Sequence, residues 1–94
     1  MASPLLTEKE KASAKEEIPN WEFDKKKLRR QWIFKDFIAA FAFITKVAII
    51  SERINHHPEW SNTYSKVIIE LTTHDSGGIT SLDIDLAKSI DGIE

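Results

Sequence analysis

Apolar and polar residues alternate in several short segments of the chain. In the clearest of them Val67, Ile69 and Leu71 are each separated by a single residue. Alternation with period two places such residues on one face of a β-strand. The same pattern, bounded by turn-forming residues, recurs elsewhere. We therefore expect four strands, at 21–24, 28–34, 59–62 and 66–73, with the first two forming an antiparallel hairpin.

Other segments carry apolar residues at helical spacing, and two of them begin with a recognisable cap. Thr7 is followed three residues later by Glu10, and Thr80 by Asp83, which is the capping-box pattern at the start of a helix. The first helix should run from about residue 8 to 17 and is poor in large apolar residues. The other two are expected at 36–54, closed by Pro58, and from 81 onward, with Leu82, Leu86, Ile90 and Ile93 facing inward.

The segment 36–54 is apolar almost all round, since 13 of its 19 residues are apolar. One stripe at helical spacing comprises Phe37, Ala40, Phe41, Ile44, Val47, Ala48 and Ile54. Four large apolar residues lie off it: Ile38, Phe43, Ile49 and Ile50. A helix of this kind is buried on more than one side, so we expect a homodimer or homotetramer formed through it. The alternative is a helix that packs broadly within its own domain.

The predicted order is α-β-β-α-β-β-α over a chain of 94 residues. This length suits one domain, residues 1–94. The order predicts an α+β two-layer sandwich, with a four-stranded antiparallel sheet and the helices on one of its faces.

Composition narrows the chemistry and the partners. The chain contains no cysteine, which excludes disulfides, thiolate catalysis and cysteine-bound metals. Its net charge of −2 argues against direct nucleic-acid binding. The basic residues of 25–30 fit a solvated hairpin tip. The polar first 20 residues do not read as a secretory signal, and the apolar run 38–50 is too short to span a membrane. We expect a cytoplasmic protein.

Candidate catalytic groups gather between residues 56 and 74, which include all three histidines. His56 and His57 follow the long helix, and His74 ends the clearest strand. Helical spacing would place Glu52 on the same face as His56, where it could orient that ring. A histidine near its ordinary pKa both donates and accepts protons at neutral pH.

Other chemistries fit less well. A zinc-binding histidine pair on a helix normally sits at i and i+4, whereas His56 and His57 are adjacent. No G-x-S-x-G segment points to a serine nucleophile. Trp60 could form the wall of a site for an aromatic ligand or serve as a hydrophobic anchor. The two histidines could also simply stabilise a helix end.

Two segments carry a specific motif: residues 55–67, NHHPEWSNTYSKV, and residues 71–83, LTTHDSGGITSLD. Together with FKDF at 34–37, AFAF at 40–43 and Val47-Ala48, they resemble the pterin-4a-carbinolamine dehydratase family. The resemblance covers about Trp21 to Ile90 and is weakest in residues 1–18. Asn55 stands where some members carry Asp, and Ile79 where Leu is commoner.

The resemblance implies a hydro-lyase that removes water from 4a-hydroxytetrahydrobiopterin to give quinonoid dihydrobiopterin, without a metal or other cofactor. By motif position, the implied catalytic residues are His56, His57 and His74. The implied supporting carboxylates are Glu52 and Asp83. The implied substrate-binding residues are Asn55, Thr72, Thr73 and Asp75, to which we add Trp60 as a candidate.

The resemblance leaves two other functions open. Some animal members bind the dimerisation helices of a homeodomain transcription factor, which makes a helical protein partner an alternative. A pterin-binding role in another pathway, such as molybdopterin metabolism, is a second alternative.

Overall fold

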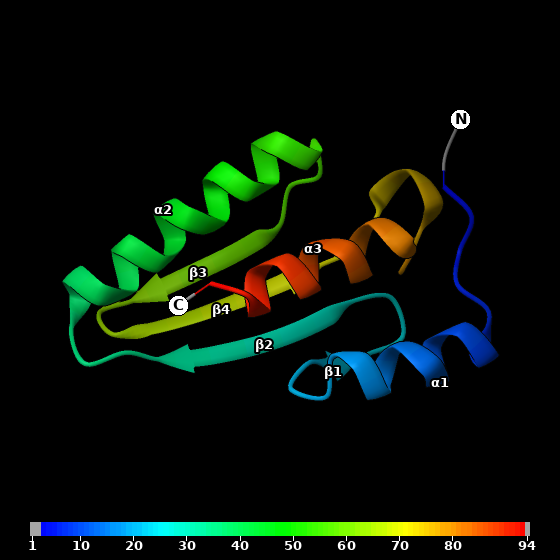
Figure 1. The fold of residues 1–94 in the computed structure, drawn as a ribbon, viewed down its shortest axis with the longest axis horizontal. Helices are drawn as coiled ribbons and strands as arrows, with labels where there is room; N and C mark the ends of the chain where they lie inside the picture. The colour runs from blue at the N-terminus through cyan, green and yellow to red at the C-terminus, as the bar shows by residue number, and fades with distance from the viewer. Residues whose placement is uncertain (1–2, 94) are drawn as a thin grey trace.

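The computed structural model describes residues 3–93 and contains three α-helices and one four-stranded sheet (Figure 1). The elements follow one another as α1 (Glu8–Glu17), β1 (Glu22–Phe23), β2 (Leu28–Ile33), α2 (Phe37–Ile54), β3 (Glu59–Thr63), β4 (Lys66–Leu71), a one-turn 3₁₀ helix η1 (His74–Ser76) and α3 (Ser81–Asp91). The predicted element order is confirmed, with β1 shorter than expected and η1 added.

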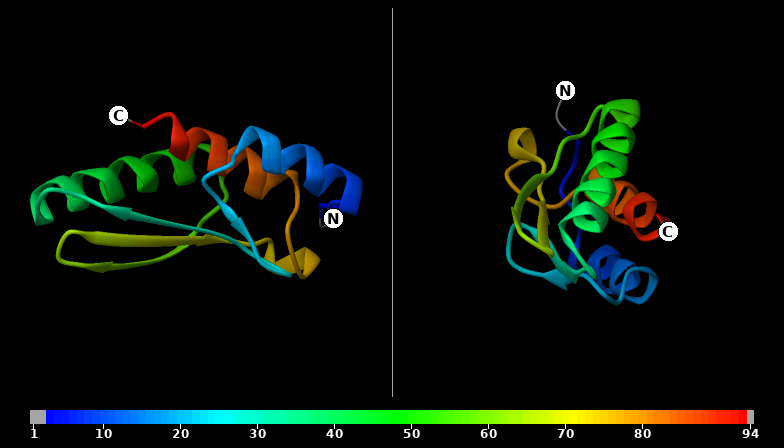
Figure 2. Two further views of the ribbon diagram at one scale, coloured as in Figure 1. Left: turned by 90° about the horizontal axis from the view of Figure 1, so that it is seen from below. Right: turned by 90° about the vertical axis from the view of Figure 1, so that its left-hand side faces the viewer.

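The sheet has the strand order β1-β2-β4-β3, and every neighbouring pair is antiparallel. Figure 2 shows the three helices on one side of the sheet. This is the predicted α+β arrangement. It brings the C-terminal end of β4 close to the start of α3 (Figure 1).

Alternation along β4 divides the sheet into a buried and an exposed face. Val67, Ile69 and Leu71 are fully buried beneath the helices, whereas Lys66 on the other face is exposed. On α3, the buried side chains of Leu86 and Ile90 continue the same core. Fully burying each such side chain stabilises the fold by about 1.5–3 kcal/mol.

The first helix is better anchored than its composition indicates. Ala14 and Ile18 are buried in the core, and the Leu6 backbone N–H donates to the carbonyl of Ile79. Leu5 pairs with Thr80 in an isolated antiparallel bridge. The segment before α1 is thereby tied to the loop that leads into α3.

The core-facing side of α2 shares Ala40, Ile44 and Val47 with the predicted stripe but is rotated away from the rest of it. Its buried residues are Ala40, Phe43, Ile44, Val47 and Ser51. Phe43, which was placed off the stripe, is only 7% exposed and packs against Trp32 and Phe34. Phe37 and Phe41, which were placed on the stripe, are 46% and 55% exposed. In a helix that is apolar almost all round, periodicity does not determine which face meets the sheet.

Local signals at the helix ends are mostly confirmed. Both capping boxes form, at Thr7 with Glu10 and at Thr80 with Asp83. The end of α2 was wrongly attributed to Pro58. Asn55 ends this helix in a left-handed backbone conformation, with φ of 54°, which asparagine tolerates better than most residues.

Two expectations about surfaces can be compared with the structure. Within residues 3–93, no helix combines the length and the apolar character needed to cross a membrane. The basic residues of 25–30 were expected to be solvated at a hairpin tip, which is only partly correct. Lys27 forms ion pairs with Glu59 and Glu70, and Arg30 forms one with Asp91.

Candidate active site

A polar cavity of about 330 Å³ opens where α2 ends, β4 ends and α3 begins. Its lining residues are Asn55, His56, His57, Thr72, Thr73, His74, Asp75 and Leu82. The three histidines predicted to be catalytic therefore share one cavity. Its volume lies within the range typical of small-molecule sites.

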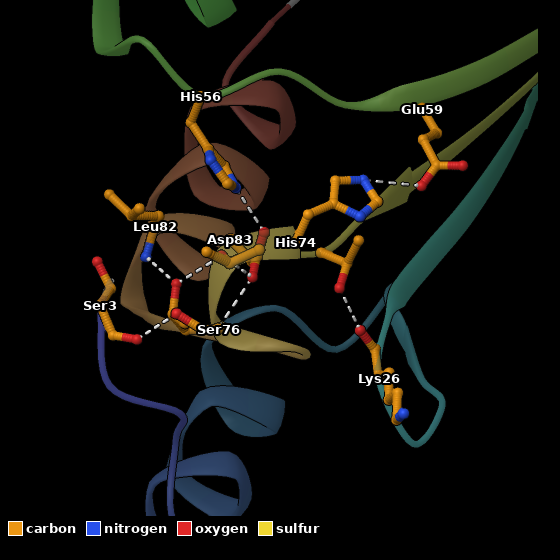
Figure 3. A network of polar contacts seen from close by, with 11 residues as sticks. Ser3, Lys26, His56, Glu59, His74, Ser76, Leu82 and Asp83 are labelled. Carbon is orange, nitrogen blue, oxygen red and sulfur yellow. Dashed lines mark hydrogen bonds and ion pairs between the residues drawn. The ribbon is translucent and has the colours of Figure 1, made fainter. Parts of the chain in front are cut away.

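His56 is held by the carboxylate of Asp83. Its Nε2 lies 2.6 Å from Asp83 Oδ1, and the Asp83 side chain is fully buried. The second carboxylate oxygen accepts from the Thr73 hydroxyl at 2.8 Å and from the Thr80 backbone N–H at 2.9 Å. An ionised carboxylate only accepts hydrogen bonds, so this contact favours the His56 tautomer with its proton on Nε2. The capping box of α3 thus also orients a catalytic candidate (Figure 3).

His57, and not His56, is the partner of Glu52. His57 Nε2 lies 2.5 Å from Glu52 Oε1. The prediction that Glu52 orients His56 is wrong because it extended helical spacing past the end of α2. Asn55 turns the backbone into the left-handed region, so the two histidines no longer follow the helix.

His74 faces a carboxylate that we did not predict. It begins η1, and its Nε2 lies 3.5 Å from Oε1 of Glu59 on β3 (Figure 3). Glu59 lies inside the recognised motif, two residues after His57. Nothing in the sequence indicates that β3 places it opposite a histidine 15 residues further on. Leu82, another cavity residue, was predicted only as part of the core.

The remaining predicted residues divide into two groups. Asn55, Thr72, Thr73 and Asp75 line the cavity. The Thr72 hydroxyl donates to the Lys26 carbonyl at 2.6 Å, which ties the β1–β2 loop to the site (Figure 3). Trp60 does not belong to the lining; it lies on the edge strand β3 and is 42% exposed.

The arrangement of these groups favours proton transfer. Each histidine faces a different carboxylate: Asp83, Glu52 or Glu59. Among residues 3–93, no three His, Asp or Glu side chains are grouped so that they could hold a metal ion. Imidazole rings oriented by carboxylates, around a cavity open to a ligand, are suited to general acid–base catalysis.

The family model described as pterin 4 alpha carbinolamine dehydratase matches residues 4–93. The chain belongs to this family. The match includes the first helix, where the sequence resemblance was weakest, and it extends over both halves of the histidine motif.

Several curated relatives are similar over most of their length. A protein from Synechococcus sp. (strain WH7803) is 50% identical over 93 residues, covering 99% of each chain. One from Prochlorococcus marinus (strain MIT 9303) is 48% identical over 94 residues, covering 100% of this chain and 98% of the relative. Both relatives are named as candidate pterin-4-alpha-carbinolamine dehydratases.

Two solved structures share the fold. One, described as a transcriptional coactivator/pterin dehydratase from Brucella melitensis, superimposes with a TM-score of 0.88 at 37% identity, covering 93% of this chain and 95% of that one. The other is a pterin dehydratase-like protein described as a RuBisCO assembly factor in the alpha-carboxysome. It has a TM-score of 0.60 at 18% identity, covering 79% of this chain and 89% of that one. At that identity the likeness concerns the fold alone.

Proposed function

We propose that this protein removes water from 4a-hydroxytetrahydrobiopterin to give quinonoid dihydrobiopterin. The observation that carries the proposal is the single cavity lined by His56, His57 and His74, each facing its own carboxylate. Membership of the family supports the same substrate class.

The reaction needs two proton transfers, and the site offers groups for both. The C4a–O bond breaks as the leaving hydroxyl receives a proton, and N5 of the ring loses a proton to a base. One proton is given and one is taken, so no oxidant or reductant is consumed. Positioned acid–base groups contribute about 10²–10⁴-fold each to such steps. We infer that two of the three imidazoles act as acid and base, and that Asp83 and Glu52 hold the tautomers of His56 and His57.

The cellular role that follows is recycling of tetrahydrobiopterin after aromatic amino acid hydroxylation. An aromatic amino acid hydroxylase encoded by the source organism would support this role. Its absence would favour use of the same site in other pterin metabolism.

A direct assay tests the activity. Purified protein is added to freshly generated 4a-carbinolamine, and the loss of absorbance of this intermediate is followed against the uncatalysed rate. We expect a clear acceleration that survives exhaustive treatment with chelators. No acceleration would refute the dehydratase function, and a loss of activity that added zinc restores would replace acid–base catalysis by metal catalysis.

We also propose that α2 mediates self-association. Four large apolar side chains are exposed on this helix: Phe37 at 46%, Ile38 at 80%, Phe41 at 55% and Ile49 at 56%. Contiguous exposed apolar residues typically mark an interaction surface. A second copy of the chain is the occupant that we favour, and a helical segment of another protein is the alternative.

A further inference from the structure

Glu59 is the third carboxylate around the candidate site, and no role is assigned to it so far. His56 and His57 pair with Asp83 and Glu52, the two carboxylates expected to support the site. His74 has Glu59, whose Oε1 lies 3.5 Å from the His74 Nε2. This distance is within the range of an ion pair and longer than a normal hydrogen bond. The three dyads draw their carboxylates from three different elements: α2, β3 and α3.

We propose that Glu59 is a positioning residue for His74, acting through this ring in the proposed dehydration. His74 has an exposed side chain, at 78%, compared with 11% for His56. Packing therefore restrains the His74 ring little, and its orientation depends on polar contacts. Holding an imidazole in one tautomer and one orientation is the role that carboxylates play beside catalytic histidines.

The charge around Glu59 shows how its carboxylate is kept in place. Glu59 and Glu70 are directly opposite each other on β3 and β4, and like charges in that position repel. Lys27 lies between them, with its Nζ 3.9 Å from Glu59 Oε2 and 3.6 Å from Glu70 Oε1. One oxygen of Glu59 thus faces Lys27 while the other faces His74.

This geometry favours one tautomer of the His74 ring. Because an ionised carboxylate only accepts, the proton of a neutral His74 ring belongs on Nε2, facing Glu59. The lone pair is then on Nδ1, and this is the atom that exchanges a proton with the substrate. Exposed ion pairs contribute little on their own, but a bound heterocycle removes water from the site and strengthens them.

The kinetic test compares Glu59→Gln with the matched control Glu70→Gln. Glu70 and Glu59 both form an ion pair with Lys27, but of these two carboxylates only Glu59 also faces a histidine. We expect Glu59→Gln to lower kcat by about three- to ten-fold with KM little changed, and Glu70→Gln to leave kcat within about two-fold. In a His74→Ala background, Glu59→Gln should have no further effect. An equal loss in Glu70→Gln, or an undiminished effect in the His74→Ala background, would overturn the proposal.

A second measurement does not depend on activity. Nitrogen-15 NMR of the imidazole rings reports the tautomer of His74 in the free protein. We expect a larger share of the Nε2–H form in the wild type and in Glu70→Gln than in Glu59→Gln. Identical His74 signals in all three proteins would overturn the positioning role, even if the dehydratase assay succeeds. Inactive wild-type protein with the expected NMR change would instead refute the proposed function and leave the dyad standing.

Discussion

The three histidines occupy environments of graded exposure, although they share one cavity. The side chain of His56 is 11% exposed, that of His57 54% and that of His74 78%. His56 is also the one whose carboxylate partner is fully buried. Removing the His56 side chain therefore leaves a buried carboxylate without one of its partners. The carboxylates that face His57 and His74 are exposed to solvent.

Truncation of each histidine tests catalysis at the residue scale. We expect His56→Ala, His57→Ala and His74→Ala each to lower the dehydration rate, by about 10²–10⁴-fold where the ring is the acid or the base, with losses that do not add in double variants. Initial rates measure the effect, and circular dichroism controls for folding. Three variants with wild-type rates would show that the rings are structural.

Asp83 caps α3 and, in the proposed mechanism, positions His56, so its neutral analogue should affect both stability and rate. Asp83→Asn replaces a carboxylate that accepts from His56, Thr73 and the Thr80 backbone. We expect unfolding to become easier by about 1–3 kcal/mol, because a buried group loses acceptor capacity, and the dehydration rate to fall as well. Urea denaturation and initial rates provide the two measurements.

The neighbouring Asp85 offers a control for Asp83, since it lies two residues further along α3 and is exposed. Asp85→Asn should leave both stability and rate close to the wild type. If Asp83→Asn were as stable as Asp85→Asn, the hydrogen bonds of the α3 cap would not contribute as described.

At the scale of elements, caps and anchors explain why a short helix such as α1 is ordered. The Thr7 side chain accepts from the Glu10 backbone N–H, and the Thr7 backbone N–H donates to the Glu10 carboxylate. The latter bond holds the pKa of Glu10 below its usual value. Buried Ala14 and Ile18 then fasten the helix to the core.

The lowered pKa of Glu10 predicts a pH dependence of stability. A carboxyl whose folded pKa lies below its unfolded pKa stabilises the fold above the unfolded value, here 4.5, and loses this contribution as the pH falls through the folded value. Glu10→Gln should therefore be less stable than the wild type near neutral pH, and the difference should shrink in acid. Urea denaturation at several pH values measures it; a difference that does not change with pH would contradict the assignment.

At the scale of the whole molecule, the apolar surface of α2 is the feature that a single chain does not bury. Ile38 and Phe41 are 80% and 55% exposed, whereas Phe43 is in the core. Substitution of Phe43 would therefore report on folding, and not on association. Ile38 and Phe41 are the positions at which a charge should disrupt self-association alone.

We expect the double variant Ile38→Glu/Phe41→Glu to have a lower mass by light scattering than the wild-type oligomer, with its secondary structure retained. Each buried apolar side chain contributes about 1.5–3 kcal/mol to association, and a buried carboxylate removes that contribution. Ile33→Glu is the control, because Ile33 is 66% exposed on β2, where it pairs with Lys66. An unchanged mass in the double variant, or an equal loss in the control, would exclude α2 as the interface.

Local patterns in the chain were sufficient for the element order, the fold class and the three histidines. Alternation defined β4, capping boxes located the starts of α1 and α3, and a specific motif placed His56, His57 and His74 in one site. Each of these signals depends on residues that are close together in the chain or on a motif visible in the sequence itself. They therefore predict structure without knowledge of the tertiary contacts.

Tertiary contacts decided the features that the patterns left open. The apolar residues of α2 surround the helix, so only packing on the sheet selected Phe43 over Phe41. The left-handed backbone at Asn55 turns the chain after α2, so that His57 and not His56 faces Glu52. Glu59 reached His74 because antiparallel pairing of β3 with β4 brings the start of one strand to the end of the other. The packing of α2 on the sheet and the pairing of β3 with β4 join residues distant in sequence, and no local periodicity encodes them.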